Sequence, residues 1–357
     1  MGKHQITIPV FIPHLGCPHR CIFCDQWSTT PAEAEAGADI VDDTVLRYLP
    51  HVRKTVKRIE LAFFGGSFTG IKKEIQESFL RRARHHLETG AIHGIRLSTR
   101  PDYISNESLA LLEKYGVTTV EIGVQSLDDK VLSAASRGHS ADDVFAAVEC
   151  IKRNGFDFVI QLMAGLPGET RESALRTARS AAQAGPSAVR IYPAVVLKGT
   201  FLERLWASGE YSPLSMEDAV DLCKDLHRIF MDHDIPIIRT GLHPLGPGQS
   251  KNIVAGPYHP SFGFLVKSRV RRDLMAELIS RYLVANTVPP HGRIHLVLPD
   301  KNTEEFVGSA RDNINYLQKR FNLAGIRYSA GPVSDVQIID ERPGSERPRG
   351  GINGITL

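Results

Sequence analysis

The sequence predicts an α/β fold over the first 240 residues, with parallel strands that form a closed or partly open barrel. Short apolar segments rich in β-branched and aromatic residues alternate there with longer amphipathic segments. This alternation is typical of parallel strands joined by right-handed crossovers. Six or seven such units fit a barrel better than a doubly wound open sheet. The residues that could carry chemistry follow the short segments, where a barrel has its reactive groups.

The expected strands are each a few residues long and are bounded by Gly, Pro or polar residues: 6–12, 59–64, 95–98, 119–124, 158–163, 188–193 and 236–239. The expected helices between them cover residues 73–87, 106–115, 141–154 and 171–184. Ser105 and Ser140 precede two of these helices as N-caps. Gly116, Gly155 and Gly185 follow three of them, where a left-handed residue is favoured.

The pattern changes after residue 240, which indicates a different organisation. Residues 240–263 are dense in Gly, Pro and His and predict a long functional loop. A basic helix is expected over 265–285, followed by a strand at 294–298, a helix at 303–322 and strands at 326–329 and 336–339. We therefore expect a barrel domain at 1–245, a loop and basic helix at 246–290, a small α/β unit at 291–340 and a mobile tail at 341–357.

The composition is that of an ordinary globular protein. The 357 residues are 42% apolar and 23% charged, which excludes a collagen, a disulfide scaffold and a wholly disordered chain. The formal net charge of +3 permits a nucleic-acid partner but does not require one. No apolar run approaches the ~20 residues that span a bilayer, and the N-terminus lacks a signal-peptide pattern. We therefore expect a cytoplasmic protein with reduced cysteines and no membrane contact.

Three of the five cysteines form a Cys-x3-Cys-x2-Cys loop directly after the first expected strand: Cys17, Cys21 and Cys24. Three thiolates on a [4Fe–4S] cluster leave one iron open to an outside ligand, as a reactive cluster requires. A structural zinc site needs a fourth ligand. The candidates for it are His14, His19, Cys150 and Cys223. Spacing alone leaves this alternative open, although the last two lie in helical patterns and are expected to be packed thiols.

With Phe23 before its third cysteine, the loop resembles the signature of the radical S-adenosylmethionine (radical SAM) superfamily. The resemblance covers about residues 5–245 through motifs that follow later strands, at 65–69, 98–103, 121–126, 137–139 and 165–169. These motifs are similar to those of the branch that holds the Elongator catalytic subunit and the oxygen-independent coproporphyrinogen oxidases. The resemblance implies a partial, six- to seven-unit TIM-like barrel, a [4Fe–4S] cluster on the three cysteines and S-adenosylmethionine as the second cofactor.

The resemblance also implies contacts with S-adenosylmethionine. Gly65 and Gly66 would receive the methionyl end through bare backbone, and Ser67 stands where many relatives carry an acid. Arg137 would grip the methionyl carboxylate with two parallel hydrogen bonds. Glu121 would point into the barrel, either as a polar core residue or as one that tunes the site. The remaining expected cofactor contacts are Phe23, Ser98, Arg100, Gln125 and Gln161.

The implied reaction begins when a flavodoxin- or ferredoxin-type donor supplies one electron to the cluster. Cleavage of the sulfonium then yields methionine and a 5′-deoxyadenosyl radical, which removes a hydrogen from a substrate. The loop after residue 240 would cover the barrel mouth, so its polar residues are candidates for substrate contacts or for a structural lid: His243, Gln249, Lys251, Tyr258 and His259. No catalytic side chain is identified. The ~110 residues after 245 hold no recognisable acetyl-CoA loop, which argues against acetyl transfer.

Three functions remain open. The first is a radical SAM enzyme that modifies a nucleotide of tRNA or another RNA, which the Elongator-like motifs and the basic stretch at 267–281 favour. The second is a radical SAM enzyme that acts on a small metabolite or a tetrapyrrole, which the weak net charge suits equally well. The third is a zinc-binding, non-catalytic nucleic-acid module.

Overall fold

The computed structural model describes residues 5–12, 14–17, 21–25, 37–52, 55–243, 249–285 and 292–339. Its contacts divide the chain into two compact units, Met1–Pro260 and Ser261–Leu357. The expected loop-and-helix segment at 246–290 therefore contributes to both units. The expected tail at 341–357 lies outside the described residues.

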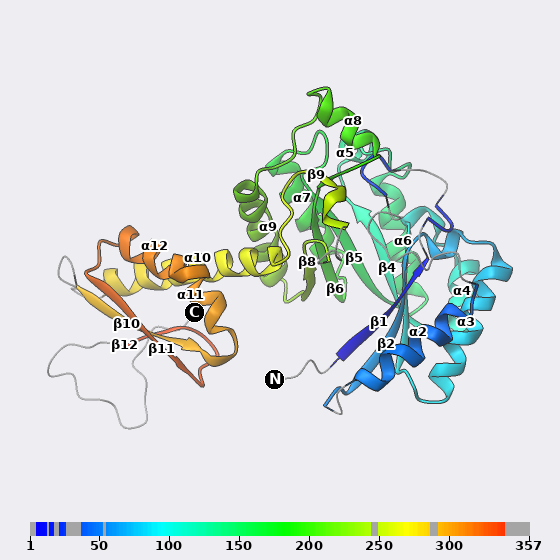
Figure 1. Ribbon diagram of the computed structural model, residues 1–357, viewed down its shortest axis with the longest axis horizontal. Coiled ribbons are helices and arrows are strands. Elements are labelled where there is room, and N and C mark those ends of the chain that lie inside the picture. Colours follow the sequence, from blue (N-terminus) through cyan, green and yellow to red (C-terminus); the bar gives the residue numbers. More distant parts are fainter. Residues whose placement is uncertain are drawn as a thin grey trace. The chain divides into compact units, whose positions relative to one another are not determined.

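Seven strands of the first unit form one sheet in the order β1-β2-β3-β4-β5-β6-β8, and all neighbours pair in parallel. The strands are β1 (Gln5–Ile12), β2 (Arg58–Gly65), β3 (Gly94–Thr99), β4 (Val117–Gln125), β5 (Asp157–Ala164), β6 (Ala188–Pro193) and β8 (Ile237–Thr240). Figure 1 shows the helices on the outside of this curled sheet. The predicted α/β partial barrel is confirmed.

Several helices of the first unit begin at a residue whose side chain caps the helix. Ser105, Ser140 and Thr170 each close a capping box at the start of a helix. These helices are α4 (Asn106–Lys114), α6 (Ala141–Arg153) and α7 (Arg171–Gln183). The layer also contains α2 (Ile40–Tyr48), α3 (Lys73–Glu88), α5 (Asp129–Ala134), α8 (Phe201–Ala207) and α9 (Met216–Met231). Within the described parts of the chain, no helix combines the length and apolarity needed to cross a bilayer.

Alternate strand positions serve the two faces of the sheet. On β2, Leu61 and Phe63 are fully buried, and Phe63 packs against Phe79 of α3 with ring centroids 5.9 Å apart. Polar side chains occupy the alternate positions, which face the other side of the sheet. Glu60 on β2 and Glu121 on β4 are two of them, and both are buried. The outer face of the sheet therefore builds the apolar core under the helices, and the inner face carries charge.

The second unit is a small α/β structure. Its sheet has the order β11-β10-β12, with β10 parallel to β11 and antiparallel to β12. These strands are β10 (Arg293–Pro299), β11 (Gly325–Gly331) and β12 (Gln337–Ile339), and the basic helix is α10 (Phe262–Ala285).

The prediction of a single helix over 303–322 is wrong. The segment forms α11 (Thr303–Val307) and α12 (Asp312–Arg320) instead. Gly308 ends α11 with φ 79°, and Ala310 and Arg311 also have positive φ values. A glycine in this conformation terminates a helix, because it places the chain outside helical geometry.

Candidate active site

A cavity of about 330 Å³ is lined by the cysteine loop and by residues at the C-terminal ends of β1 to β6. It brings together motifs that lie far apart in the sequence. The predicted cluster and cofactor residues that line it are Cys17, Cys21, Phe23, Cys24, Gly65, Gly66, Ser98, Arg100, Gln125, Arg137 and Gln161. Ser67 is the one residue of the predicted set that does not line the cavity.

The three cysteines influence one another electrostatically. Burial raises the pKa of the Cys17 thiol, and the charge of Cys21 raises it further. Burial, together with the charges of Cys21 and Cys17, raises the pKa of Cys24 to about 12. Arg137 lowers both pKa values. Three neighbouring thiols of this kind lose their protons when a metal centre binds them, because only the thiolate is a ligand.

The distant cysteines do not complete a four-ligand site with this loop. Cys150 is buried in α6, where its Sγ donates to Asn106 Oδ1 over 3.4 Å, and Cys223 is buried in α9. Neither lines the cavity, whereas His14 does. His19 lies outside the described residues. In the described ranges, no three His, Cys, Asp or Glu side chains stand as close together as a single metal ion requires.

The turn after β2 packs its backbone directly against the cysteine loop. Ser67 N donates to Leu15 O over 2.8 Å. A Cβ on Gly66 would lie 2.1 Å from Leu15 O, and a Cβ on Gly16 would lie 2.1 Å from Ser67 O. The two segments can therefore approach this closely only because both positions are glycine. The contact holds the bare backbone of Gly65 and Gly66 beside the cysteines in the cavity wall.

Ser67 links the ends of two strands. It is fully buried, its Oγ hydrogen-bonds to Thr99 Oγ1 over 2.9 Å, and the same atom accepts from Arg100 N over 3.3 Å. The side chain of Arg100 is in turn held by Asp102, with 2.9 Å between Nε and Oδ1 and 2.9 Å between Nη2 and Oδ2. Ser67 therefore positions the start of the loop after β3.

Arg137 and Gln125 carry the clearest evidence of a polar ligand. Arg137 donates through Nη1 to Cys21 Sγ over 3.0 Å and through Nη2 to Gly123 O. Among the described residues, the buried atoms Gln125 Oε1 and Arg137 Nε have no hydrogen-bond partner. Unpaired buried polar atoms are costly in a native protein. The donor set of three thiols, with these two orphaned atoms beside it, fits an iron–sulfur cluster and the polar methionyl end of S-adenosylmethionine.

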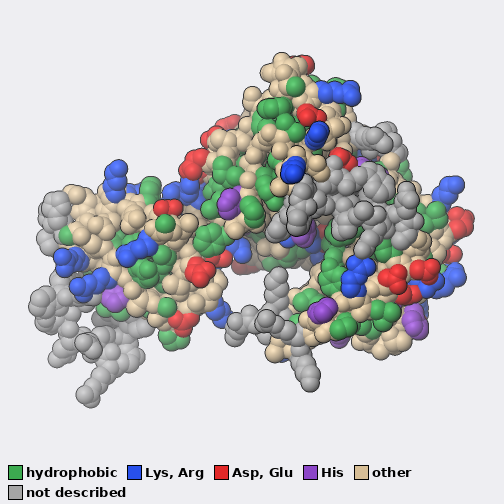
Figure 2. Space-filling view, viewed as in Figure 1, with side chains coloured by type: hydrophobic (Ala, Val, Ile, Leu, Met, Phe, Trp, Pro, Cys, Tyr) green, Lys and Arg blue, Asp and Glu red, His purple; other side chains and the backbone are tan. Residues whose placement is uncertain are grey.

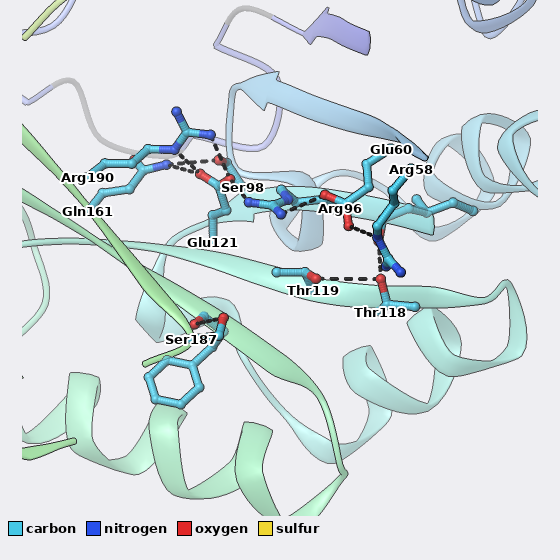
Figure 3. Close-up of polar contacts among 12 residues, drawn as sticks. Arg58, Glu60, Arg96, Ser98, Thr118, Thr119, Glu121, Gln161, Ser187 and Arg190 are labelled. Atoms are coloured by element: carbon cyan, nitrogen blue, oxygen red, sulfur yellow. Dashed lines mark hydrogen bonds and ion pairs between the residues drawn. The ribbon is translucent and has the colours of Figure 1, made fainter. Parts of the chain in front are cut away.

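A row of buried ion pairs crosses the inner face of the sheet (Figure 3). Glu60 Oε2 lies 2.6 Å from Arg96 Nη2, and Arg96 Nη1 lies 3.0 Å from Glu121 Oε1. Glu121 also receives Arg190 through two contacts, 2.9 Å from Nε to Oε2 and 3.0 Å from Nη2 to Oε1. Burial alone would raise the pKa of Glu121, but Arg190 and Arg96 hold it below its ordinary value.

Gln161 joins this row to the cavity. Its Nε2 donates to Glu121 Oε2 over 2.8 Å and to Ser98 Oγ over 3.2 Å. Ser98, Gln161 and Arg190 all line the cavity. Arg96 and Arg190 were not among the site residues predicted from the sequence. The available signal was their position on strands whose alternate residues face the barrel interior, together with a buried acid on the neighbouring strand.

The substrate-side candidates fall in different places. His243 lines the cavity, whereas Lys251, Tyr258 and His259 do not. Lys251 and His259 are exposed and Tyr258 is half-buried. The side chain of Gln249 lies outside the described residues. Partial burial and the charges of Arg239 and Arg190 lower the pKa of His243 to about 4.

Comparisons with known proteins agree with this geometry. The profile of the Radical SAM superfamily matches residues 11–181, and the profile of the Radical_SAM C-terminal domain matches residues 186–272. An uncharacterized protein of Methanocaldococcus jannaschii, MJ0486, is 30% identical over 241 residues, which cover 65% of this chain and 72% of that protein.

Two named relatives are more distant. The tRNA uridine(34) acetyltransferase of Methanocaldococcus infernus is 28% identical over 58% of this chain and 46% of its own length. Human Elongator complex protein 3 is 26% identical over 55% of this chain and 42% of its own length. The matched region thus spans less than half of these two relatives. The solved structure of archaeal Elp3 from M. infernus has the same fold, with a TM-score of 0.60 at 23% identity over 76% of this chain and 63% of that chain.

Proposed function

The chain belongs to the radical SAM superfamily, and from this premise we propose that it binds a [4Fe–4S] cluster through Cys17, Cys21 and Cys24 and cleaves S-adenosylmethionine reductively. The observation that carries the proposal is the meeting of these thiols with Gln125 Oε1 and Arg137 Nε, two buried polar atoms without partners, in one cavity. Membership of an enzyme superfamily also speaks against the non-catalytic zinc module.

When bound, the cluster and S-adenosylmethionine supply a 5′-deoxyadenosyl radical that removes a hydrogen atom from the substrate, with the electron coming from a flavodoxin- or ferredoxin-type donor. The residues of this chain bind and orient. Arg137 offers hydrogen bonds to the methionyl carboxylate, and Gln125 Oε1 can accept one from the methionyl amine or a ribose hydroxyl. Gly65 presents main-chain atoms to the methionyl amine, and Ser98 with Gln161 offers hydrogen bonds to ribose hydroxyls.

Apolar side chains complete the cavity wall and exclude water. Phe11, Phe64, Met163, Val195 and Leu197 line it. An apolar lining that excludes water protects a reactive intermediate from side reactions and strengthens the polar contacts inside the cavity. The residues of this wall come from different strands and loops, so the wall surrounds the cavity from several sides.

The substrate in this proposal is a nucleotide of RNA. Two relatives are named for tRNA uridine modification or for Elongator. Residues 261–357 contain fourteen Lys and Arg against ten Asp and Glu, and Figure 2 shows several of these cations on the visible face of this unit. Arg272 stacks over Tyr316 with 4.1 Å to the ring centroid. Arginines beside exposed aromatic rings are typical of surfaces that bind single-stranded nucleic acid.

Reconstitution tests the cofactor chemistry. The full chain is loaded anaerobically with iron and sulfide, reduced with dithionite and supplied with S-adenosylmethionine, and 5′-deoxyadenosine is measured. Cys21→Ala should reduce its formation at least ~100-fold, because a ligand of the cluster is lost. The matched control Cys150→Ala should retain it. Unchanged formation of 5′-deoxyadenosine by Cys21→Ala would refute the cluster assignment.

RNA binding tests the substrate class. Affinity for bulk tRNA should fall steeply with added salt, because bound cations are released when arginines contact phosphates. A double substitution, Arg272→Gln with Arg320→Gln, should weaken binding and flatten the salt dependence. No binding at low salt would favour the alternative, a small metabolite or tetrapyrrole held in the cavity alone.

A further inference from the structure

The row of buried ion pairs ends at β6 and β8 with more arginines than carboxylates. Arg190 on β6 is in register with Gln161 on β5 and with Arg239 on β8, so two guanidinium-bearing residues stand side by side on neighbouring strands. Like charges in adjacent positions of a sheet are destabilising unless something neutralises them. The nearby acid is Glu121, which already binds both Arg190 and Arg96.

No acidic residue of the described ranges pairs with Arg239. Its Nε donates to Gly241 O over 3.1 Å. Burial lowers the pKa of Arg239, Tyr192 opposes this shift, and the charge of Arg190 adds to it. Arg190 is buried and Arg239 is half-buried, so these positive charges are partly withdrawn from water and an anion would stabilise them.

Arg190 retains hydrogen-bonding capacity toward the cavity. A guanidinium has five N–H donors, and Glu121 takes one from Nε and one from Nη2. In Figure 3 the third nitrogen of Arg190 points away from Glu121. Arg190 is buried, with 11% of its side chain exposed, yet it lines the cavity together with Tyr192 and His243. Tyr192 shares a further hydrogen bond with Arg190. Glu121 therefore fixes the orientation of Arg190, and the two partners together leave some of the five N–H donors for a ligand.

These arginines form a group separate from the cations at the cysteines. The charges that act on Cys17 are those of Arg100 and Arg137. The charges that act on His243 are those of Arg239 and Arg190. Arg137 contacts Cys21 directly, whereas Arg190 lies on β6 and lines the cavity beside Tyr192 and His243, so the two arginines serve different parts of the cavity wall.

We propose that the Arg190 end of the cavity is a subsite for an oxyanion of the substrate, a phosphate or a carboxylate, with Arg190 as the direct donor and Arg239 as a second positive charge. Glu121 is a positioning residue for this subsite, because it holds Arg190 in place through two hydrogen bonds. The assignment of this anion to the substrate rests on the proposed radical SAM function. It identifies the substrate as a molecule that presents an anionic group some distance from the hydrogen that is removed.

The test is an equilibrium titration of the full chain with inorganic phosphate and, separately, with malonate, followed by calorimetry. The reconstituted protein is saturated with S-adenosylmethionine, so that the cysteine end is filled. Arg239→Met should weaken anion binding about 3- to 10-fold, consistent with the loss of one charge. The double variant Glu121→Gln with Arg190→Gln, which leaves no unpaired buried charge, should weaken it at least about 10-fold. Arg153→Met, an exposed position on α6, is the matched control and should change nothing.

The outcomes separate this subsite from the cofactor chemistry. Weaker anion binding by both Arg239→Met and the double variant supports the subsite, and the tighter of the two probes tells whether phosphate or carboxylate is preferred. If neither probe binds, or if both variants bind as the unmodified protein does while 5′-deoxyadenosine still forms, the subsite is refuted and the radical SAM function stands. If no iron or 5′-deoxyadenosine is found, the function fails, and titration without S-adenosylmethionine still tests the arginines.

Discussion

The two ends of the cavity are built differently. The cysteine end consists of backbone segments that touch, with Gly16 and Gly66 allowing the loop after β1 to lie on the turn after β2. The arginine end consists of single long side chains from separate strands, held by the shared acid Glu121. We infer that close backbone packing suits the proposed site of a permanently bound cofactor, whereas a charged network suits the proposed site of an exchangeable ligand.

The largest expected effect on stability comes from a substitution that disrupts the arginine end of the cavity. Glu121→Ala leaves the buried guanidiniums of Arg96 and Arg190 without their common acceptor. We expect a loss of about 3–5 kcal/mol in the free energy of unfolding, because an uncompensated buried charge is expensive. Chemical denaturation measures it. The control Glu107→Ala, which removes an exposed ion pair with Lys73, should cost less than about 0.5 kcal/mol. A loss below about 1 kcal/mol for Glu121→Ala would show that the network contributes little.

The next largest effect is expected from a substitution that disrupts the cysteine end of the cavity. Gly66→Ala places a Cβ 2.1 Å from Leu15 O, so the cysteine loop must move. We expect about 1–3 kcal/mol of destabilisation and a clear fall in the iron bound after reconstitution. Gly37→Ala meets nothing within 4 Å and serves as the control. Full iron content and stability in Gly66→Ala would mean that the close approach is not required.

The smallest expected effect concerns a buried acid, Glu169, which forms no ion pair with any cation of the described residues. Burial raises the pKa of Glu169 to about 7, although its Oε2 accepts from Gly165 N over 2.6 Å. The folded state therefore holds a proton that the unfolded chain has lost, so stability should be highest near pH 5 and should fall between about pH 5 and 7. We expect a decrease of about 2 kcal/mol or less.

Thermal unfolding across this pH range checks the prediction for Glu169. Glu169→Gln should remove this part of the pH dependence, because the amide does not titrate. Glu121 should add little above pH 5, since Arg190 and Arg96 lower its pKa and keep it ionised. An unchanged pH profile in Glu169→Gln would contradict the assignment.

Much of the fold could be predicted from the sequence because its strands and helices depend on patterns of neighbouring residues. Short β-branched strands and serine-capped helices specify the barrel units, and the cysteine loop is a contiguous motif. The break between α11 and α12 could not be predicted, because it depends on a positive φ at Gly308, Ala310 and Arg311 inside an otherwise helical pattern.

The parts of the site that could be predicted are those whose residues lie close together in the sequence. The cysteines and the glycine pair lie in short motifs. The pairing of Glu121 with Arg96 and Arg190 is set by strand register, which links residues 25 and 69 positions apart in the sequence. Ser67 lies within a motif, yet its hydroxyl turns to Thr99 and Arg100 because the backbone contact with Leu15 fixes its orientation.

Electron paramagnetic resonance of the anaerobically reconstituted, dithionite-reduced chain tests the central claim most directly. If Cys17, Cys21 and Cys24 are the protein ligands, as we propose, one iron would stay accessible, and S-adenosylmethionine should change the spectrum of the reduced cluster. A cluster signal that stays the same when S-adenosylmethionine is added, or protein that takes up zinc in place of iron and sulfide, would contradict the account.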